Sequence, residues 1–157
     1  NASNLATLAR DTSNVAQNVA RIDGGNGIDT LKLDGAGLVL DLTAITGPAI
    51  QSIEKIDLTG SGNNTLKLTL QDMLQVVDNS NVFNSSNTTS GLAATVGKKQ
   101  LMVDGNAGDK VVLSDLSNWT LSGTPVVAYG HSYSVYNHNT SAQQMLIDQT
   151  IVVSSVL

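Results

Sequence analysis

Side-chain oxygens gather around a glycine-rich stretch near residue 25. The run Asp23-Gly24-Gly25-Asn26-Gly27-Ile28-Asp29 sets two carboxylates and an amide around three glycines. Because glycine adopts positive φ without steric cost, a turn here exposes backbone carbonyls beside those side chains. Calcium takes about six to eight such oxygens. The stretch predicts a Ca²⁺ site with charge from Asp23 and Asp29 and carbonyls from Gly25 and Gly27. The alternative is a turn in which Asp and Asn only shape the backbone.

Two later stretches repeat the order of an apolar residue, an Asp, a Gly- and Asn-rich turn and an alternating strand. They are Ile56–Leu68 and Val103–Leu113. In the later one, Asp104 and Asp109 take the parts of the two carboxylates. In the earlier one, Asn63 and Asn64 offer neutral oxygens, which predicts weak calcium binding or none. The intervals are irregular, so the three turns are either stacked coils or similar hairpin turns within a sandwich.

Composition limits the partners. The chain has 157 residues, a formal net charge of −5 and only 8 Lys and Arg, which argues against nucleic acid and anionic membranes. No apolar run has the length of a membrane span, so we expect no membrane insertion, and no signal peptide is recognisable. Cysteine is absent, and Glu54 is the only glutamate among 13 acidic residues. An Asp-rich chain without disulfides suits a secreted protein braced by calcium.

The elements that must position these residues are mainly strands. We expect one domain over 1–157, with an N-terminal helical segment at 1–22 and a β domain at 23–157. In the first segment apolar residues recur at spacings of three and four, from Leu5 to Ile22. A Thr69/Asp72 capping pair predicts a short internal helix at 70–77, and 78–91 reads as a polar loop anchored by Val82 and Phe83.

Alternating apolar residues predict strands at Thr30–Leu33, Leu38–Leu42, Ser52–Leu58, Thr65–Leu70, Gln100–Val103, Lys110–Leu113, Trp119–Leu121, Val126–Tyr129, Tyr133–Tyr136, Gln144–Ile147 and Ile151–Val153. The fold class is therefore mainly β, either a sandwich or a short β-roll or solenoid-like stack, with an N-terminal helix and one short internal helix.

Enzyme signals are poor. The run from Gly130 to Ser134 lacks the closing glycine of a nucleophile elbow. No spacing matches a zinc site, and no glycine-rich turn continues into a phosphate-binding motif. We expect a non-enzymatic protein, with a secreted hydrolase domain as a weaker alternative.

Aromatic residues and histidines gather late in the chain. Tyr133, Tyr136 and His138 lie near Asn137 and Asn139, a combination that could stack on and hydrogen-bond a glycan or peptide. The alternative is that the tyrosines lie on strands and bury their rings.

Taken in order, these motifs resemble a module of giant bacterial RTX adhesins over roughly residues 20–155. Gly24 to Lys32 matches every position of the RTX nonapeptide Gly-Gly-x-Gly-x-Asp-x-apolar-x, once. The resemblance implies type I secretion, display at the bacterial cell surface, Ca²⁺-dependent folding and a role in surface attachment or biofilm. The implied partners are neighbouring domains of the same long chain.

Overall fold

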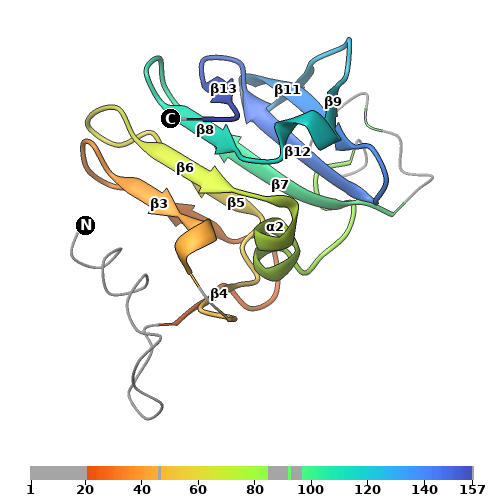
Figure 1. Ribbon diagram of the computed structural model, residues 1–157, viewed down its shortest axis with the longest axis horizontal. Helices are drawn as coiled ribbons and strands as arrows, with labels where there is room; N and C mark the ends of the chain where they lie inside the picture. Colours follow the sequence, from red (N-terminus) through yellow and green to blue (C-terminus); the bar gives the residue numbers. More distant parts are fainter. Residues whose placement is uncertain (1–20, 46, 85–91, 93–96, 157) are drawn as a thin grey trace.

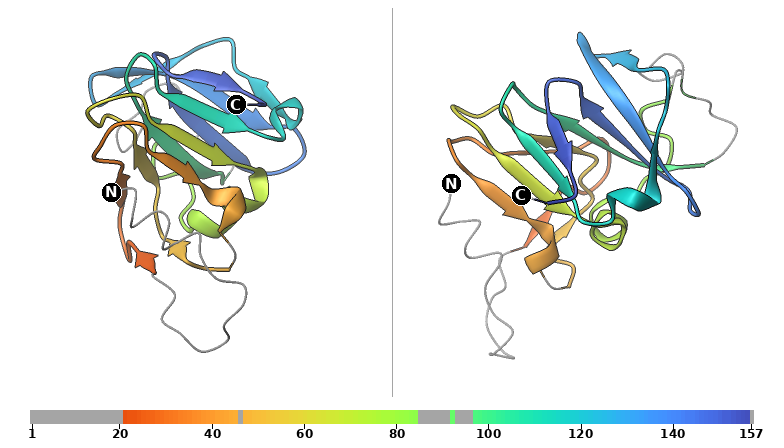
Figure 2. Two further views of the ribbon diagram at one scale, coloured as in Figure 1. Left: turned by 60° about the vertical axis from the view of Figure 1, so that its left-hand side comes forward. Right: turned by 45° about the horizontal axis from the view of Figure 1, so that its top comes forward.

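Two β-sheets face each other in the computed structural model, which describes residues 21–45, 47–84, 92 and 97–156 (Figure 1). One sheet has four strands, in the order β13-β8-β6-β3, and all its neighbours are parallel. The other has seven strands, of which β2, β5, β7 and β12 are mutually parallel. Figure 2 shows the sheets as two layers from two further directions.

Four strand–turn–strand units build both sheets. Each unit gives one strand to the seven-stranded sheet, turns, and gives its next strand to the four-stranded sheet. The pairs are β2 (Thr30–Lys32) with β3 (Val39–Asp41), β5 (Lys55–Asp57) with β6 (Thr65–Leu68), β7 (Lys99–Asp104) with β8 (Lys110–Leu113), and β12 (Gln143–Asp148) with β13 (Val152–Ser154). We number them units 1 to 4. Parallel pairing follows, because every unit runs in the same direction as the one before it.

Register places like residues in rows. Leu31, Ile56, Val103 and Ile147 are successive partners in one sheet. Leu40, Leu66, Val111 and Val153 are successive partners in the other. These rows meet between the sheets in the larger hydrophobic core. A smaller core centred on Phe83, Met102 and Tyr133 lies on the opposite side of the seven-stranded sheet.

The seven-stranded sheet continues past unit 4 in antiparallel fashion. β11 (His131–His138) pairs with β12, and both β10 (Val126–Ala128) and β9 (Trp119–Leu121) pair with β11. A separate parallel pair joins β1 (Ile22–Asp23) to β4 (Ile50–Gln51). Short 3₁₀ helices lie at η1 (Leu42–Ala44) and η2 (Leu116–Asn118).

Helix α2 (Leu70–Val76) closes one end of the larger core with Met73 and Val76. Thr69 and Asp72 cap it reciprocally: Thr69 Oγ1 accepts from the Asp72 N–H, and the Asp72 carboxylate accepts from the Thr69 N–H at 2.7 Å. The predicted internal helix and its capping pair are therefore confirmed.

The mainly β class is confirmed as well, and each of the predicted strands overlaps an observed one. The predicted N-terminal helix lies outside the described residues, apart from its last two positions. Ile22, placed in that helical segment, lies in β1 instead, because Ile22 N–H bonds the Ala49 carbonyl at 2.8 Å. Phe83 is fully buried, as expected for an anchor of its loop.

The expectation that the three glycine-rich turns are equivalent is wrong. The second and third turns occupy equivalent places, joining β5 to β6 and β7 to β8. The first joins β1 to β2, so it precedes unit 1 instead of crossing between the sheets. The equivalent crossing in unit 1 is the short turn at residues 33–38. None of these turns is a hairpin, since the strands they join belong to different sheets.

Candidate functional site

The turn at residues 24–29 packs tightly against the bend at Ser52. A Cβ added to Gly24 would lie 2.0 Å from the Ser52 carbonyl oxygen and 2.5 Å from Asp29 Cβ. Gly25 and Gly27 have φ of +84° and +124°, values at which any other residue is strained. The glycines thus let the Asp29 side chain and the Ser52 carbonyl converge on one short piece of backbone.

Asp23 and Asp29 differ sharply in their surroundings. Asp23 is exposed, accepts the Gly25 N–H at 3.2 Å and pairs with Arg21 at 3.4 Å. In Asp29 the Oδ2 atom is buried and has no hydrogen-bond partner. The Asp29 N–H donates to Glu54 Oε2 at 3.0 Å. A buried carboxylate oxygen without a donor lacks the compensation that such atoms almost always have.

The second turn uses its asparagines for packing and backbone hydrogen bonds. Asn64 is fully buried; its Oδ1 accepts the Leu38 N–H at 2.8 Å, and its Nδ2 donates to the Gly35 and Leu58 carbonyls at 3.0 Å each. Asn63 is exposed, and its amide packs against Gly108 of the next turn. Asn64 therefore joins unit 2 to unit 1.

In the third turn Asp109 likewise hydrogen-bonds backbone groups, one of them in a neighbouring unit. It is 1% exposed, and its Oδ1 and Oδ2 accept the N–H groups of Asn64 at 2.7 Å and Asn106 at 2.6 Å. Two backbone donors aimed at one carboxylate stabilise its charge without a metal. Both oxygens of Asp109 are therefore used in hydrogen bonds, and the one from Asn64 links unit 3 to unit 2.

Asp104 belongs to a row of carboxylates on the seven-stranded sheet. Asp57 and Asp104 are partners in register, and Asp148 follows in the next strand. Each has one basic neighbour: Lys32 lies 3.2 Å from Asp57, Lys55 2.6 Å from Asp104, and His131 Nδ1 2.9 Å from Asp148. Neighbouring strands are only about 4.8 Å apart, so Lys32 and Lys55 offset repulsion along the row.

The carboxylate pKa values in two such pairs reflect this environment. Burial raises the pKa of Asp57, but hydrogen bonds from the Thr59 hydroxyl and N–H, together with Lys32, outweigh it and hold the pKa below its usual value. The same balance, with Thr43 and Lys67, lowers the pKa of Asp41. Both aspartates stay ionised as structural acceptors.

The three residues predicted to bind a glycan or peptide do not form one open surface. Tyr133 is fully buried and donates its hydroxyl to Asp104 at 2.7 Å. Burial, followed by that carboxylate, raises the Tyr133 pKa. Tyr136 packs against the larger core, and His138 makes an edge contact with the Trp119 ring at 5.0 Å. The buried-ring alternative holds for Tyr133.

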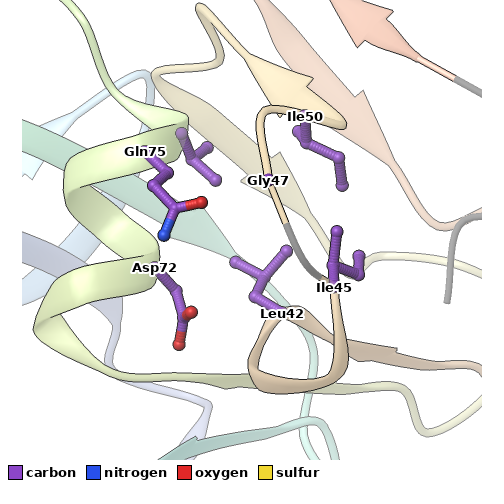
Figure 3. Close-up of a pocket in the computed structure, with 7 residues that line it drawn as sticks. Leu42, Ile45, Gly47, Ile50, Asp72 and Gln75 are labelled. Atoms are coloured by element: carbon purple, nitrogen blue, oxygen red, sulfur yellow. The ribbon is translucent and has the colours of Figure 1, made fainter. Parts of the chain in front are cut away.

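Two hollows of different form are lined by described residues. The one between α2 and η1 holds about 10 Å³, room for a single water. In Figure 3, Asp72 and Gln75 of α2 face Leu42 and Ile45 across it. A wider, open hollow of about 360 Å³ is lined by Gly27, Ile28, Asn79, Ser80 and Val82. Within the described ranges, no three His, Cys, Asp or Glu side chains gather as metal ligands, and no helix is long and apolar enough to cross a membrane.

Glu54 is the residue that sequence reasoning passed over. It is 0% exposed and lies between β4 and β5, with its Oε1 3.4 Å from Asn79 Nδ2. The available signal was its being the only glutamate, set between Ile53 and Ile56.

Comparison of the chain with models of protein families, with curated proteins and with solved structures found no match in any of the three.

Proposed function

We propose that this chain is a calcium-stabilised, non-enzymatic structural and adhesion module of a large secreted bacterial adhesin. The support is the ordered set of motifs that resembles RTX adhesins, together with a fold made of stacked units instead of a fold built around a cleft. The module acts in surface attachment or biofilm, as one link among neighbouring domains of the same long chain.

The finer fold that we propose is a short β-roll. Parallel pairing of four successive units supports this, because each unit stacks its apolar row beside that of the next unit. Such a stack transmits force and spaces other domains without needing a pocket. The antiparallel strands β9 to β11 then end the roll at unit 4.

One observation supports calcium: the buried, unpartnered Oδ2 of Asp29 in the nonapeptide turn. Asp29 fits a calcium ligand, because it is a carboxylate oxygen that lacks a donor and lies beside glycine backbone. Bound Ca²⁺ would supply the missing positive charge there. Asn64 and Asp109 fit less well, since backbone N–H groups already occupy the Asn64 Oδ1 and both Asp109 oxygens.

Calcium-dependent stability also suits secretion. A ligand that binds only the folded state stabilises it by RT ln(1 + [L]/Kd), about 2.7 kcal/mol at a hundredfold excess over Kd. Folding then becomes favourable where calcium is plentiful, outside the cell, and export of the unfolded chain by a type I system is not opposed by early folding.

Thermal unfolding tests the proposal. We expect Tm to rise with millimolar Ca²⁺, to fall with a chelator and to be unaffected by Mg²⁺ at the same concentration. Asp29→Asn should remove most of the calcium response. Asp34→Asn, which removes an exposed carboxylate from the unit 1 turn, should keep it. Identical melting curves with calcium and with chelator would refute calcium stabilisation.

A further inference from the structure

Glu54 is a buried carboxyl group without a basic partner among the described residues. It is 0% exposed, and none of the described Lys, Arg or His side chains forms an ion pair with it. Its hydrogen bonds come from the Asp29 N–H at 3.0 Å and from Asn79 Nδ2 at a long 3.4 Å. A carboxylate removed from water is costly unless it is paired or bound to a metal.

The immediate neighbour of Glu54 is Asp29, whose carboxylate has an unsatisfied oxygen. Glu54 Oε2 touches the backbone nitrogen of Asp29, whose own Oδ2 is buried and unpartnered. Standard bond lengths hold an aspartate carboxylate within about 5 Å of its own nitrogen. Two ionised carboxylates this close repel each other unless a cation lies between them.

We infer that Glu54 is the second anionic ligand of the cation at Asp29, so that one Ca²⁺ joins the turn at 24–29 to the bend at 52–54 and to Asn79. This inference rests on the proposed function, because it names the remaining ligands of the same ion. Two carboxylates neutralise a divalent cation, and all the groups gathered here bind through oxygen, which suits Ca²⁺.

Further oxygens surround the same place. The Ser52 carbonyl oxygen and the Asp29 side chain both lie within 3 Å of the point where a Cβ on Gly24 would be. Ser52 has φ of +54°, a strained value for a residue with a side chain, and it belongs to the bend that brings this carbonyl to Gly24. Asn79 now presents Nδ2 to Glu54; a half-turn of the amide would present Oδ1 to a cation instead.

An open hollow adjoins one edge of the proposed site. The open hollow of about 360 Å³ includes Gly27 from the turn and Asn79 and Ser80 from the facing segment. Asn79, which donates to Glu54, is thus open to solvent on the side where a cation would approach the proposed site.

The ion would clip a segment distant in sequence. Directly after Asn79, Ser80 forms a bridge with Lys99, and Phe83 is buried in the smaller core on the outer side of the seven-stranded sheet. Calcium at Glu54 and Asn79 would thus hold the 78–84 segment against unit 1, where β2 is the edge strand.

Calorimetric titration of the chelator-treated 157-residue chain with Ca²⁺ tests the inference, with Glu54→Gln as the variant and Asp34→Asn as the control. Gln keeps the length of the side chain and an oxygen to accept the Asp29 N–H. We expect the variant to bind Ca²⁺ at least about tenfold more weakly than the parent chain. In chelator its Tm should equal or exceed that of the parent, because a buried carboxyl group without a basic partner has been removed. The control should match the parent in both measurements.

The outcomes separate the two proposals. If the parent chain binds Ca²⁺ and Glu54→Gln binds it equally well, Glu54 is not a ligand and only this inference fails. If the parent chain binds no Ca²⁺, calcium stabilisation fails too. If Glu54→Gln is less stable than the parent in chelator, Glu54 is instead a structural acceptor. Chemical-shift changes at Asn79 on Ca²⁺ addition would confirm that the distant segment joins the site, and their absence would exclude it.

Discussion

The Asp109 carboxylate accepts the backbone N–H of Asn64 at 2.7 Å, across the boundary between units 3 and 2. The Asn64 side chain in turn accepts the Leu38 N–H of unit 1 at 2.8 Å. One buried polar chain therefore runs along the turns of three successive units. It satisfies backbone groups that the change of direction between sheets leaves without a strand partner.

Asp109→Asn should weaken this chain without abolishing the fold. The variant keeps one acceptor oxygen but sets an amide NH₂ against a backbone N–H, so a buried donor loses its partner. We expect a loss of about 1–3 kcal/mol in the free energy of unfolding, measured by urea denaturation. The loss should be the same with calcium and with chelator. A loss seen only with calcium would show that Asp109 is a metal ligand after all.

Gly108→Ala tests how closely the units approach. Gly108 has φ of +104°, and an added Cβ would lie 2.4 Å from Asn63 Oδ1 of the neighbouring turn. Strain and crowding together should cost about 1–3 kcal/mol. Gly97→Ala is the matched control, because a Cβ there meets nothing within 4 Å. Equal urea midpoints for the two variants would contradict the close packing of these turns.

Strand positions and the α2 cap were predictable because they depend on local pattern. Alternation along Leu66, Lys67 and Leu68 marks a strand whatever its partner is, and the Thr69/Asp72 pair marks a helix start. The β1–β4 pair was missed because two-residue strands have no periodicity. Parallel pairing between units was also out of reach, since the partners Leu66 and Val111 are far apart in sequence.

The site was predictable only in its residue types. Sequence marks Asp29, Asn64 and Asp109 as oxygen donors, but their surroundings come from neighbouring units. Asp109 meets two backbone N–H groups, whereas the Asp29 Oδ2 meets none. The sequence around Glu54 does not indicate that its hydrogen-bond donor lies in a turn 25 residues earlier.

Acid should destabilise the protein through Asp57. Its pKa is lowered in the folded state, so the unfolded chain binds a proton more readily. The stability from this group is complete above the unfolded pKa of about 3.9 and is lost as pH falls through the folded value. We expect the urea midpoints of the parent chain and Asp57→Asn to differ at pH 6 and to converge below about pH 4. A difference that persists at pH 2 would mean that the carboxylate charge does not stabilise the fold.

High pH should destabilise the protein through Tyr133, whose pKa is raised in the folded state and not lowered as that of Asp57 is. Burial and the Asp104 carboxylate raise the pKa of Tyr133, so the folded state holds the phenol proton more tightly than the unfolded chain does. The resulting stability is present below the unfolded pKa of about 10 and is lost as pH rises above it. Tyr133→Phe should cost about 1–2 kcal/mol near pH 8, because Asp104 loses a buried hydrogen bond.

The difference in free energy of unfolding between Tyr133→Phe and the parent chain should then shrink as pH approaches 11. In that range the phenol ionises in the unfolded parent chain but stays protonated in the fold, which lowers the stability of the parent alone. Tyr136, whose pKa burial also raises, is present in both proteins and cancels in the comparison. Unfolding followed by Trp119 fluorescence between pH 8 and 11 measures the gap. A gap that stays constant over that range would show that the Tyr133 hydroxyl is not held by Asp104 in solution.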